Sequence, residues 1–592
     1  MKKHKIYLLA AIGLFSSCND DFLNRYPESS LVTENFFNTP ADLALFVNKL
    51  YLSLPTKNYQ DLDTDNAASS SDPSELSNLL HGSISSTTVG GWNWSQIREL
   101  NYFLENCGKA QGDQALINHY IGIVRMLRAE EYYTMIKRYH EVPWYSRSLN
   151  DDDKELLYKP RDSRDLVMDS IMADLQFAVA NVNSEIGNRS TFSKGYAYGM
   201  MARIALHEGT YRKYHDELNL ESSAHKYLKI AETACKELMS QGLYRLYDNG
   251  KPASDYGDLF KTINLQSNPE IILMKDYDDA LQVRHSISKE VLNYISNLSR
   301  SLMESYEILK DGKASPFSDL PDYDKTTYMA TFQDRDPRYR QTFVYPGFIR
   351  PGDTKPYMPN LNLGGYPQLK FVSDDPVQME WWRGYSDVPI MRYAEILLMY
   401  AEAKAEQGTL TQTDLDNSIN LIRKRAGMPP LKLSELPDDR ALSATYPNVT
   451  DKVILQVRRE RRVELACEGF RKDDIMRWKV GERFHGQQGI YVPGLGVWDI
   501  TGDGVEDIGI YRSSNDVPPK YKKKVLYYLE EDGKPTTIAL SENDKGHLIF
   551  TSDISSPKTF ISPKYYYYPL PQKQLQLNES LGETIFWGKT KK

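Results

Sequence analysis

The sequence predicts a mostly α-helical protein, a scaffold of tetratricopeptide-like helical hairpins with long loop-rich insertions and little β-structure. Two observations lead to this class. Apolar residues recur at helical spacing in several segments, most of which end near a glycine. Long stretches rich in Pro, Gly, Asp and Asn separate these segments. With 592 residues, of which 41% are hydrophobic and 26% charged, the chain is long enough to bury a large core.

Five segments have the spacing of an amphipathic helix. They are the stripe Val167, Ile171, Leu175 and Ala178; the stripe Ala197, Met201 and Ile204 before a stop expected at Gly209; residues 224–238 before Gly242; residues 392–407; and residues 452–468. Paired helices with glycine stops are typical of tetratricopeptide-like hairpins, although the roughly 34-residue sequence repeat of that class is not met cleanly.

The predicted insertions lie near residues 61–91, 251–387 and 486–571. They are much longer than ordinary connections, and segments of that length are usually functional or separately structured. We therefore expect one domain over residues 18–592, in which a rigid helical scaffold supports binding residues on the insertions.

The N-terminus has the pattern of a secreted protein. A basic start and an apolar stretch over residues 6–15 predict a signal peptide over residues 1–17, too short to span a bilayer. Cys18 follows two serines, which resembles the lipid-acceptor motif of bacterial lipoproteins; the alternative is an ordinary signal with an incidental Cys18. Only Cys107, Cys235 and Cys467 then remain, so at most one disulfide is possible.

The charge balance argues against nucleic acid as the main partner. The chain has 72 Lys and Arg against 80 Asp and Glu, a formal charge of −8. The basic run Arg458–Arg462 contains Glu460, and Glu464 and Glu468 follow at helical spacing. We interpret it as a structural helix with salt bridges between neighbouring turns.

Several motifs occur in a fixed order along the chain. They are Asp21-Phe22-Leu23-Asn24-Arg25-Tyr26-Pro27, Arg128-Ala129-Glu130-Glu131-Tyr132-Tyr133, Arg392-Tyr393-Ala394-Glu395 with Tyr400-Ala401-Glu402-Ala403, Ile422-Arg423-Lys424-Arg425-Ala426-Gly427, residues 458–478, and Tyr568-Pro569-Leu570-Pro571. Together they resemble the SusD/RagB family of outer-membrane nutrient-binding lipoproteins. The motif that begins at Arg128 continues to Tyr139-His140-Glu141-Val142-Pro143, where His140-Glu141 departs from the Gly-Asp usual in the family.

The resemblance implies a SusD-like helical fold with four tetratricopeptide-like units. It also implies a lipoprotein of the outer membrane, facing the cell surface, that captures an oligosaccharide and delivers it to a SusC-like TonB-dependent transporter. Members of the family bind and do not catalyse. The alternatives are a surface glycosidase and a SusD-like binder of peptide. Gly-x-Ser-x-Gly, His-Glu-x-x-His and Cys-x-x-Cys motifs are all absent from the sequence, which disfavours an enzyme.

Tryptophans in the insertions are the first candidates for a ligand site. Trp92, Asn93 and Trp94 follow two glycines, and on an extended strand both indoles project to one face. Aromatic walls with a few polar groups suit the C–H faces and hydroxyls of a sugar. Packing against the scaffold is the equal alternative. Asp65 and Asn66 could bind hydroxyls, although a turn role is the stronger interpretation.

Trp381, Trp382 and Arg383 form a second candidate. We expect one indole to be buried and the other to face the insertion surface, with Arg383 available to donate hydrogen bonds to hydroxyls or to an acidic sugar. Structural packing is the alternative interpretation.

Residues 499–507 resemble a calcium-binding loop. Oxygens at positions 1, 3, 5, 7 and 9 would come from Asp499, Thr501, Asp503, the Val505 carbonyl and Asp507. Position 12 is Ile510 in place of the bidentate Glu, which excludes a full EF-hand. A structural Ca²⁺ is the prediction, and a metal-free Asp-Gly turn is the alternative.

Tyrosine is the compositional outlier, with 41 Tyr against 19 Phe and 8 Trp. Six of the tyrosines fall within predicted scaffold helices, and we expect many to pack with the ring in the core and the hydroxyl toward water. These six are Tyr132, Tyr133, Tyr196, Tyr227, Tyr393 and Tyr400.

Overall fold

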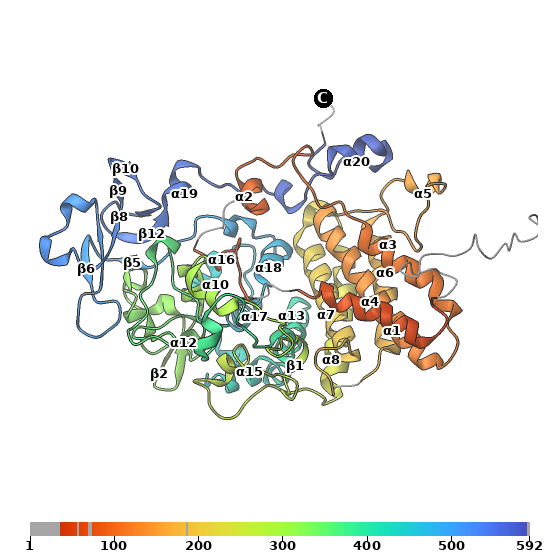
Figure 1. The fold of residues 1–592 in the computed structure, drawn as a ribbon, viewed down its shortest axis with the longest axis horizontal. Helices are drawn as coiled ribbons and strands as arrows, with labels where there is room; N and C mark the ends of the chain where they lie inside the picture. The colour runs from red at the N-terminus through yellow and green to blue at the C-terminus, as the bar shows by residue number, and fades with distance from the viewer. Residues whose placement is uncertain (1–35, 56–58, 69–73, 185–186, 589–592) are drawn as a thin grey trace, which may run out of the picture.

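The computed structural model describes residues 36–55, 59–68, 74–184 and 187–588 (Figure 1). The signal peptide expected over residues 1–17, Cys18 and the motif at residues 21–27 lie outside the described residues.

Helices dominate the described part of the chain. The α-helices are α1 Pro40–Leu50, α2 Glu75–Leu80, α3 Ser95–Asn106, α4 Gln114–Tyr139, α5 Lys154–Leu157, α6 Arg164–Asn181, α7 Lys194–Tyr214, α8 Ala224–Ser240, α9 Asp255–Asp258, α10 Ile287–Asn293, α11 Arg300–Ser305, α12 Tyr339–Thr342, α13 Tyr393–Glu406, α14 Gln412–Asp416, α15 Ile419–Arg425, α16 Arg440–Thr445, α17 Lys452–Glu464, α18 Arg471–Arg477, α19 Thr551–Ser555 and α20 Gln572–Leu577.

The strands are short and form small sheets. They are β1 Ile271–Lys275, β2 Ile308–Lys310, β3 Lys313–Ser315, β4 Val388–Arg392, β5 Tyr491–Val492, β6 Gly496–Trp498, β7 Ile508–Tyr511, β8 Val525–Tyr528, β9 Glu530–Glu531, β10 Lys534–Pro535, β11 Ile538–Leu540 and β12 Gly546–Phe550. β1 pairs with β4, and the orders β6–β7–β8 and β11–β12–β5 make two three-stranded sheets. The predicted class, mostly α with little β, is confirmed.

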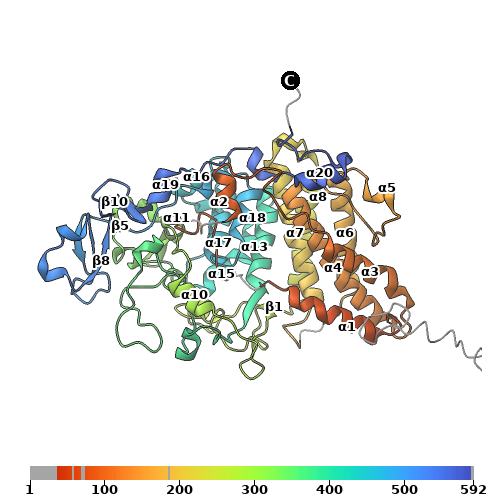
Figure 2. The same ribbon diagram turned by 45° about the horizontal axis from the view of Figure 1, so that its top comes forward.

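The long helices lie side by side (Figures 1 and 2). α4 packs along α6, α6 against α7 and α7 along α8, while α13 bridges α8 and α17. The small sheets β6–β7–β8 and β9–β10 project at the end of the molecule away from α3, α4 and α6 (Figures 1 and 2).

Glycines let α7 and α8 approach closely. A Cβ at Gly195 would lie 2.4 Å from the Tyr244 hydroxyl, and one at Gly209 would lie 2.8 Å from Leu228 Cγ. The start of α7 therefore faces the segment after α8, and its end faces the start of α8, so the two helices are antiparallel. The predicted helix stop at Gly209 is wrong, because this glycine lies inside α7 and serves packing.

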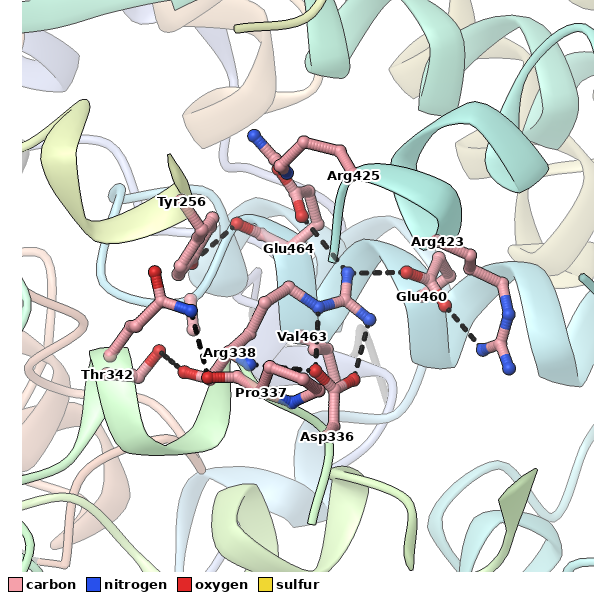
Figure 3. A network of polar contacts seen from close by, with 12 residues as sticks. Tyr256, Asp336, Pro337, Arg338, Thr342, Arg423, Arg425, Glu460, Val463 and Glu464 are labelled. Atoms are coloured by element: carbon pink, nitrogen blue, oxygen red, sulfur yellow. Dashed lines mark hydrogen bonds and ion pairs between the residues drawn. The ribbon is translucent and has the colours of Figure 1, made fainter. Parts of the chain in front are cut away.

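A buried network of ion pairs surrounds α17 (Figure 3). Arg338 contacts Asp336 at 2.7 Å, Glu460 at 2.5 Å and Glu464 at 3.0 Å, and Arg425 contacts Glu464 at 2.5 Å. Burial alone would raise the pKa of Glu464, but Arg425, Arg392 and Arg338 outweigh it and hold that pKa below its usual range. The salt bridges of Glu460 and Glu464 thus join α17 to other segments, not to the next turn of the same helix as we expected.

Tyrosines are central to the core. The six helical tyrosines and the run at residues 565–568 are all buried. Their hydroxyls often find protein partners and not water: the Tyr132 hydroxyl donates to the Tyr145 carbonyl at 3.0 Å, and that of Tyr133 lies 2.6 Å from His207 Nδ1. The predicted packing of the rings in the core is confirmed. The prediction that the hydroxyls point toward water is wrong for Tyr132 and Tyr133.

Cys107, Cys235 and Cys467 are buried free thiols. In the described ranges we find no helix that is both long and apolar enough to cross a membrane.

Candidate functional site

A pocket of about 390 Å³ opens beside the first predicted tryptophan pair. Its walls come from the loop before α3, from α3 itself, from the segment after α4, from α5 and from the C-terminal α20. The lining residues are Trp92, Trp94, Ile97, Arg98, Asn101, Pro143, Tyr145, Arg147, Ser148, Leu149, Asn150, Asp151, Leu157, Tyr158, Gln574, Leu577, Asn578 and Leu581. We name it the tryptophan pocket.

The two indoles lie together, although the segment is not the strand on which we based that prediction. The ring centroids of Trp92 and Trp94 are 5.3 Å apart, and the planes meet edge to face at 73°. Trp92 also contacts Tyr139 at 5.0 Å, and Trp94 contacts Tyr145 at 5.4 Å. Each indole is half-buried, so part of the ring packs on the scaffold and part is left to line the pocket.

Backbone contacts hold this loop against α4. The Tyr139 hydroxyl and Arg138 Nη2 both donate to the Gly90 carbonyl, at 2.8 and 3.1 Å. Gly91 has φ +92°, and a Cβ there would lie 2.9 Å from Arg138 Nε, so glycine is needed for both reasons. Asn93 does not line the pocket. Its Oδ1 accepts from the Ser95 backbone N–H and hydroxyl, at 3.0 and 2.8 Å, and so steadies the start of α3.

Hydrogen bonds fix the part of the lining next to the indoles. The buried Asn101 amide donates to the carbonyls of Tyr145 and Arg147 and accepts from Arg128, which itself pairs with Asp174 through two hydrogen bonds of 2.8 Å. Burial raises the pKa of Tyr145 to about 12, so its phenol stays neutral and donates to the Leu156 carbonyl at 3.2 Å.

One cation at the pocket is unpaired. Arg98 is exposed and has no ion-pair partner among the residues that the structure describes. Arg147 is paired with Asp153. The pocket therefore combines an aromatic wall, hydrogen-bonding groups and one available guanidinium, which is the composition of a site for a polar, partly apolar ligand.

The second tryptophan pair forms a platform and not a pocket. Trp381 is 44% exposed, Trp382 69% and the neighbouring Tyr294 59%, and the rings of Tyr294 and Trp381 lie 5.0 Å apart. Trp382 has φ +57°, and its backbone N–H donates to the buried Ser286 hydroxyl at 2.9 Å. The expectation that one indole is buried is wrong. We name Tyr294, Trp381, Trp382 and the exposed Arg383 the tryptophan platform.

The pocket and the platform lie apart. Trp381 follows the turn at Pro376–Met379, which packs on α10, whereas the pocket is built on α3. In Figures 1 and 2 α13 and α7 lie between α10 and α3. The structure thus brings Trp92 and Trp94 into ring contact and Trp381 into contact with Tyr294, but it does not join the two regions into one site.

Asp65 and Asn66 are not surface groups, which corrects our hydroxyl-binding prediction. Asp65 is fully buried and bonds Arg471 at 2.6 and 2.8 Å, with Arg462 at 3.1 Å and Arg483 at 3.5 Å. Burial alone would raise the pKa of Asp65, but Arg462 and Arg471 hold it well below its usual range. The side-chain amide oxygen Oδ1 of Asn66 accepts from Arg462 Nε at 2.8 Å. Both residues anchor their loop to the scaffold.

The predicted calcium loop connects β6 and β7. One carboxylate oxygen each from Asp499, Asp503 and Asp507 lies within 4.8 Å of the others. The Thr501 hydroxyl donates to Asp507 at 2.7 Å, and the backbone N–H groups of Gly502 and Gly504 donate to Asp499. The three carboxylates converge as the spacing requires, and the flanking elements are strands where an EF-hand has helices.

Several pocket residues were missed from the sequence. Arg98 lies four residues after Trp94, on the same face of a helix, and that spacing could have identified it. Tyr145 follows the motif at residues 139–143 and could also have been considered. The α20 residues had no local indication, because they are more than 400 residues from Trp94 in sequence.

The chain resembles known proteins over most of its length. The model of the SusD family matches residues 269–587. The SusD-like protein P2 of Formosa agariphila is 22% identical over 539 residues, which cover 83% of this chain and 93% of that protein. A SusD-like protein of Bacteroides ovatus is 21% identical over 508 residues, 80% of this chain and 82% of that protein.

Solved structures show the same fold. A SusD-like carbohydrate-binding protein from Bacteroides fragilis superposes with a TM-score of 0.63 at 21% identity, covering 92% of this chain and 99% of the other. A laminarin-binding SusD-like protein gives 0.54 at 15% identity, covering 93% and 100%. Ordered motifs, fold and family match agree, and the chain belongs to the SusD family.

Proposed function

We propose that this protein is a cell-surface lipoprotein that captures an oligosaccharide and delivers it to a SusC-like TonB-dependent transporter of the outer membrane. The supporting observation is the tryptophan pocket, whose lining combines the aromatic rings of Trp92, Trp94 and Tyr145 with hydrogen-bonding groups. Two relatives are named for carbohydrate or laminarin binding, which favours a glycan over a peptide as the cargo.

The chemistry of the pocket suits a sugar. The C–H faces of a pyranose pack on indole and phenol rings, and its hydroxyls need amide, carboxylate and guanidinium partners. Asn150, Asp151, Arg98 and Gln574 supply these along the lining. A volume of about 390 Å³ lies within the range of roughly 300–1,000 Å³ typical of small-ligand sites.

The tryptophan platform is the proposed second contact. Exposed clusters of large aromatic side chains generally mark an interaction site. Because the pocket and the platform lie apart, we propose that a short oligosaccharide occupies one of them and that only a long polysaccharide contacts both.

Membrane attachment is proposed through Cys18, with the signal peptide over residues 1–17 removed. Incorporation of labelled palmitate that is lost in Cys18→Ala tests the anchor. Co-purification of a TonB-dependent outer-membrane protein with the tagged lipoprotein tests the partner.

We also propose a structural Ca²⁺ in the loop at residues 499–507. Asp499, Asp503 and Asp507 would supply carboxylates and Val505 its carbonyl, with water or another group completing the shell. The ion would offset the mutual repulsion of the three carboxylates and fix the β6–β7 hairpin.

A glycan array followed by calorimetry is the direct test of the main proposal. We expect binding to at least one glycan and no product release from any glycan in the panel. Cleavage of a bound glycan would favour the glycosidase alternative, and binding to peptides alone would favour peptide cargo. A protein that binds nothing on the array and on a peptide panel would contradict the proposal.

A further inference from the structure

A second cavity lies away from both tryptophan regions. It has a volume of about 260 Å³ and opens between α11, α16, α17 and the segment at residues 483–488. Its lining residues are Arg300, Ser301, Glu304, Ser305, Tyr323, Asp439, Ala441, Leu442, Ala444, Thr445, Arg459, Arg483, Gly486, Gln487 and Gln488. Ala444 and Gly486 are exposed at its rim. We name it the arginine cavity.

Two of its arginines have buried nitrogens that contact carboxylates without a well-directed hydrogen bond. The side chain of Arg459 is only 3% exposed, with Nη2 2.8 Å from Glu307 and Nη1 3.7 Å from Asp439, yet neither nitrogen makes a well-directed hydrogen bond. Arg483 Nε, 3.5 Å from Asp65, makes none either. A buried donor that makes no well-directed hydrogen bond is costly, and a water, an ion or a ligand can supply the missing acceptor.

The charge of the lining favours a ligand that has a single negative charge. Three guanidinium groups, those of Arg300, Arg459 and Arg483, line the cavity against the two carboxylates of Glu304 and Asp439. Glu304 is already paired with Arg300 at 2.5 Å. The carboxylates of Asp65 and Glu307, which contact Arg483 and Arg459, are not in the lining and also pair with other arginines. Asp65 pairs with Arg471, and Glu307 pairs with Arg423.

The remaining lining suits hydroxyl groups. The side-chain oxygen Oε1 of Gln488 accepts from Arg300 Nη1 at 2.9 Å. Within the described ranges the side-chain nitrogen Nε2 of Gln488 and the Tyr323 hydroxyl have no hydrogen bond. Gln487 adds a second amide. Donors and acceptors of this kind around a cationic centre fit a molecule that has several hydroxyls and one carboxylate.

We infer that the arginine cavity is a separate binding site for a monoanionic sugar acid of one residue, a uronic acid. The carboxylate would accept hydrogen bonds from Arg459 and Arg483, and the hydroxyls would contact Gln487, Gln488 and Tyr323. A phosphate monoester matches less well, because it would add close to two negative charges to a lining with one spare positive charge.

Calorimetry and thermal shift on the purified chain test this inference with four probes. We expect glucuronate to bind and to raise the melting temperature. Glucose lacks the carboxylate, acetate lacks the hydroxyls and inorganic phosphate has the wrong charge, so each should bind at least tenfold more weakly. Equal binding of glucose, tighter binding of phosphate, or no binding of glucuronate would overturn the inference.

Variants locate the site. Arg483→Gln should weaken glucuronate binding at least tenfold. Ala444→Trp should block the cavity from its exposed rim, and Ser443→Trp, which places the same ring one position earlier on α16 outside the lining, is the matched control. Loss with Ala444→Trp and retention with Ser443→Trp is the expected pattern. Retention in Ala444→Trp would place the bound glucuronate elsewhere and contradict the inference, whatever the fold of Arg483→Gln.

Discussion

The tryptophan pocket and the tryptophan platform both offer indole rings to solvent, but the scaffold supports them differently. In the pocket, Trp92 and Trp94 are half-buried and contact Tyr139 and Tyr145 edge to face. On the platform, Trp382 is 69% exposed, and the hydrogen bond that holds it in place comes from its backbone N–H.

The difference shows that the same residue type has two energetic roles here. A ring shared between core and pocket contributes to stability, and under the proposed function it also contacts the ligand. A ring as exposed as that of Trp382 contributes little to the folded state, so the role that we propose for it is binding. Substitutions can therefore separate stability from binding at the platform but not at the pocket.

The largest change in stability should come from a substitution in the scaffold, and the changes at the two tryptophan regions can be compared with it. Asp65→Asn leaves Arg462 and Arg471 buried without their carboxylate, which should lower the free energy of unfolding by about 3–5 kcal/mol. Urea denaturation measures this. Asp322→Asn, at an exposed pair with Lys325, is the control and should change little.

Acid should weaken the helices that support the pocket. Glu208 is buried between Arg164 and Arg212; burial would raise its pKa, but the two arginines outweigh it and lower the pKa from 4.5 to about 2. Because the folded-state pKa lies below the unfolded value, its contribution is complete above about pH 4.5 and is lost as the pH falls toward 2. Melting temperatures across that range should fall less steeply in Glu208→Gln than in the wild type.

Trp94→Ala should reduce stability and glycan binding together. Because the indole is half-buried, we expect a loss of about 2 kcal/mol in the free energy of unfolding, below the 3–5 kcal/mol typical of a fully buried ring. Denaturation and calorimetry on the same preparation measure both quantities. Weaker binding at full stability would show that the ring does not support the fold.

Trp382→Ala should separate the two quantities. Its stability should change by less than about 0.5 kcal/mol, as for most surface substitutions. Binding of a long polysaccharide should weaken roughly three- to tenfold, while a short oligosaccharide that fits the pocket should bind as before. If affinity for every glycan stays unchanged, the platform has no part in capture.

Calcium should have the smallest effect, because the loop at residues 499–507 lies in a hairpin at the end of the molecule. We expect Ca²⁺ to raise the melting temperature by about 1–2 °C and a chelator to reverse it. Asp503→Asn should remove the response, and Asp516→Asn, in a nearby turn, should keep it. If neither calcium nor chelator changes the melting temperature, the loop is a turn without metal and the proposed Ca²⁺ site is wrong.

Local patterns predicted much of the fold. The stripe from Val167 to Ala178 lies within α6, residues 224–238 lie within α8, and the segment at 392–407 corresponds to α13 within a residue at each end. Helix periodicity and caps are local properties, so they can be recognised without the partner surface. Gly209 was misjudged because its role depends on Leu228, which belongs to another helix.

The candidate sites were predicted only in part. Adjacent tryptophans are visible in the chain; Trp92 and Trp94 do lie together, and Trp381 and Trp382 are both exposed. Their surroundings are not visible, because α20 reaches the pocket from the far end of the sequence. The arginine cavity likewise draws its lining from α11, Tyr323, α16, α17 and residues 483–488.

The sequence by itself determined the helical class, the ordered family motifs and the residue types able to contact a glycan. These properties depend only on residues that are close together in the chain. Tertiary structure alone decided which of those residues face solvent. Asp65 and Asn66 look like surface loop groups in the sequence, yet they are buried among arginines that come from residues 462–483. Whether a polar group binds a ligand or the protein depends on which distant charges the fold places beside it, and no local pattern records that.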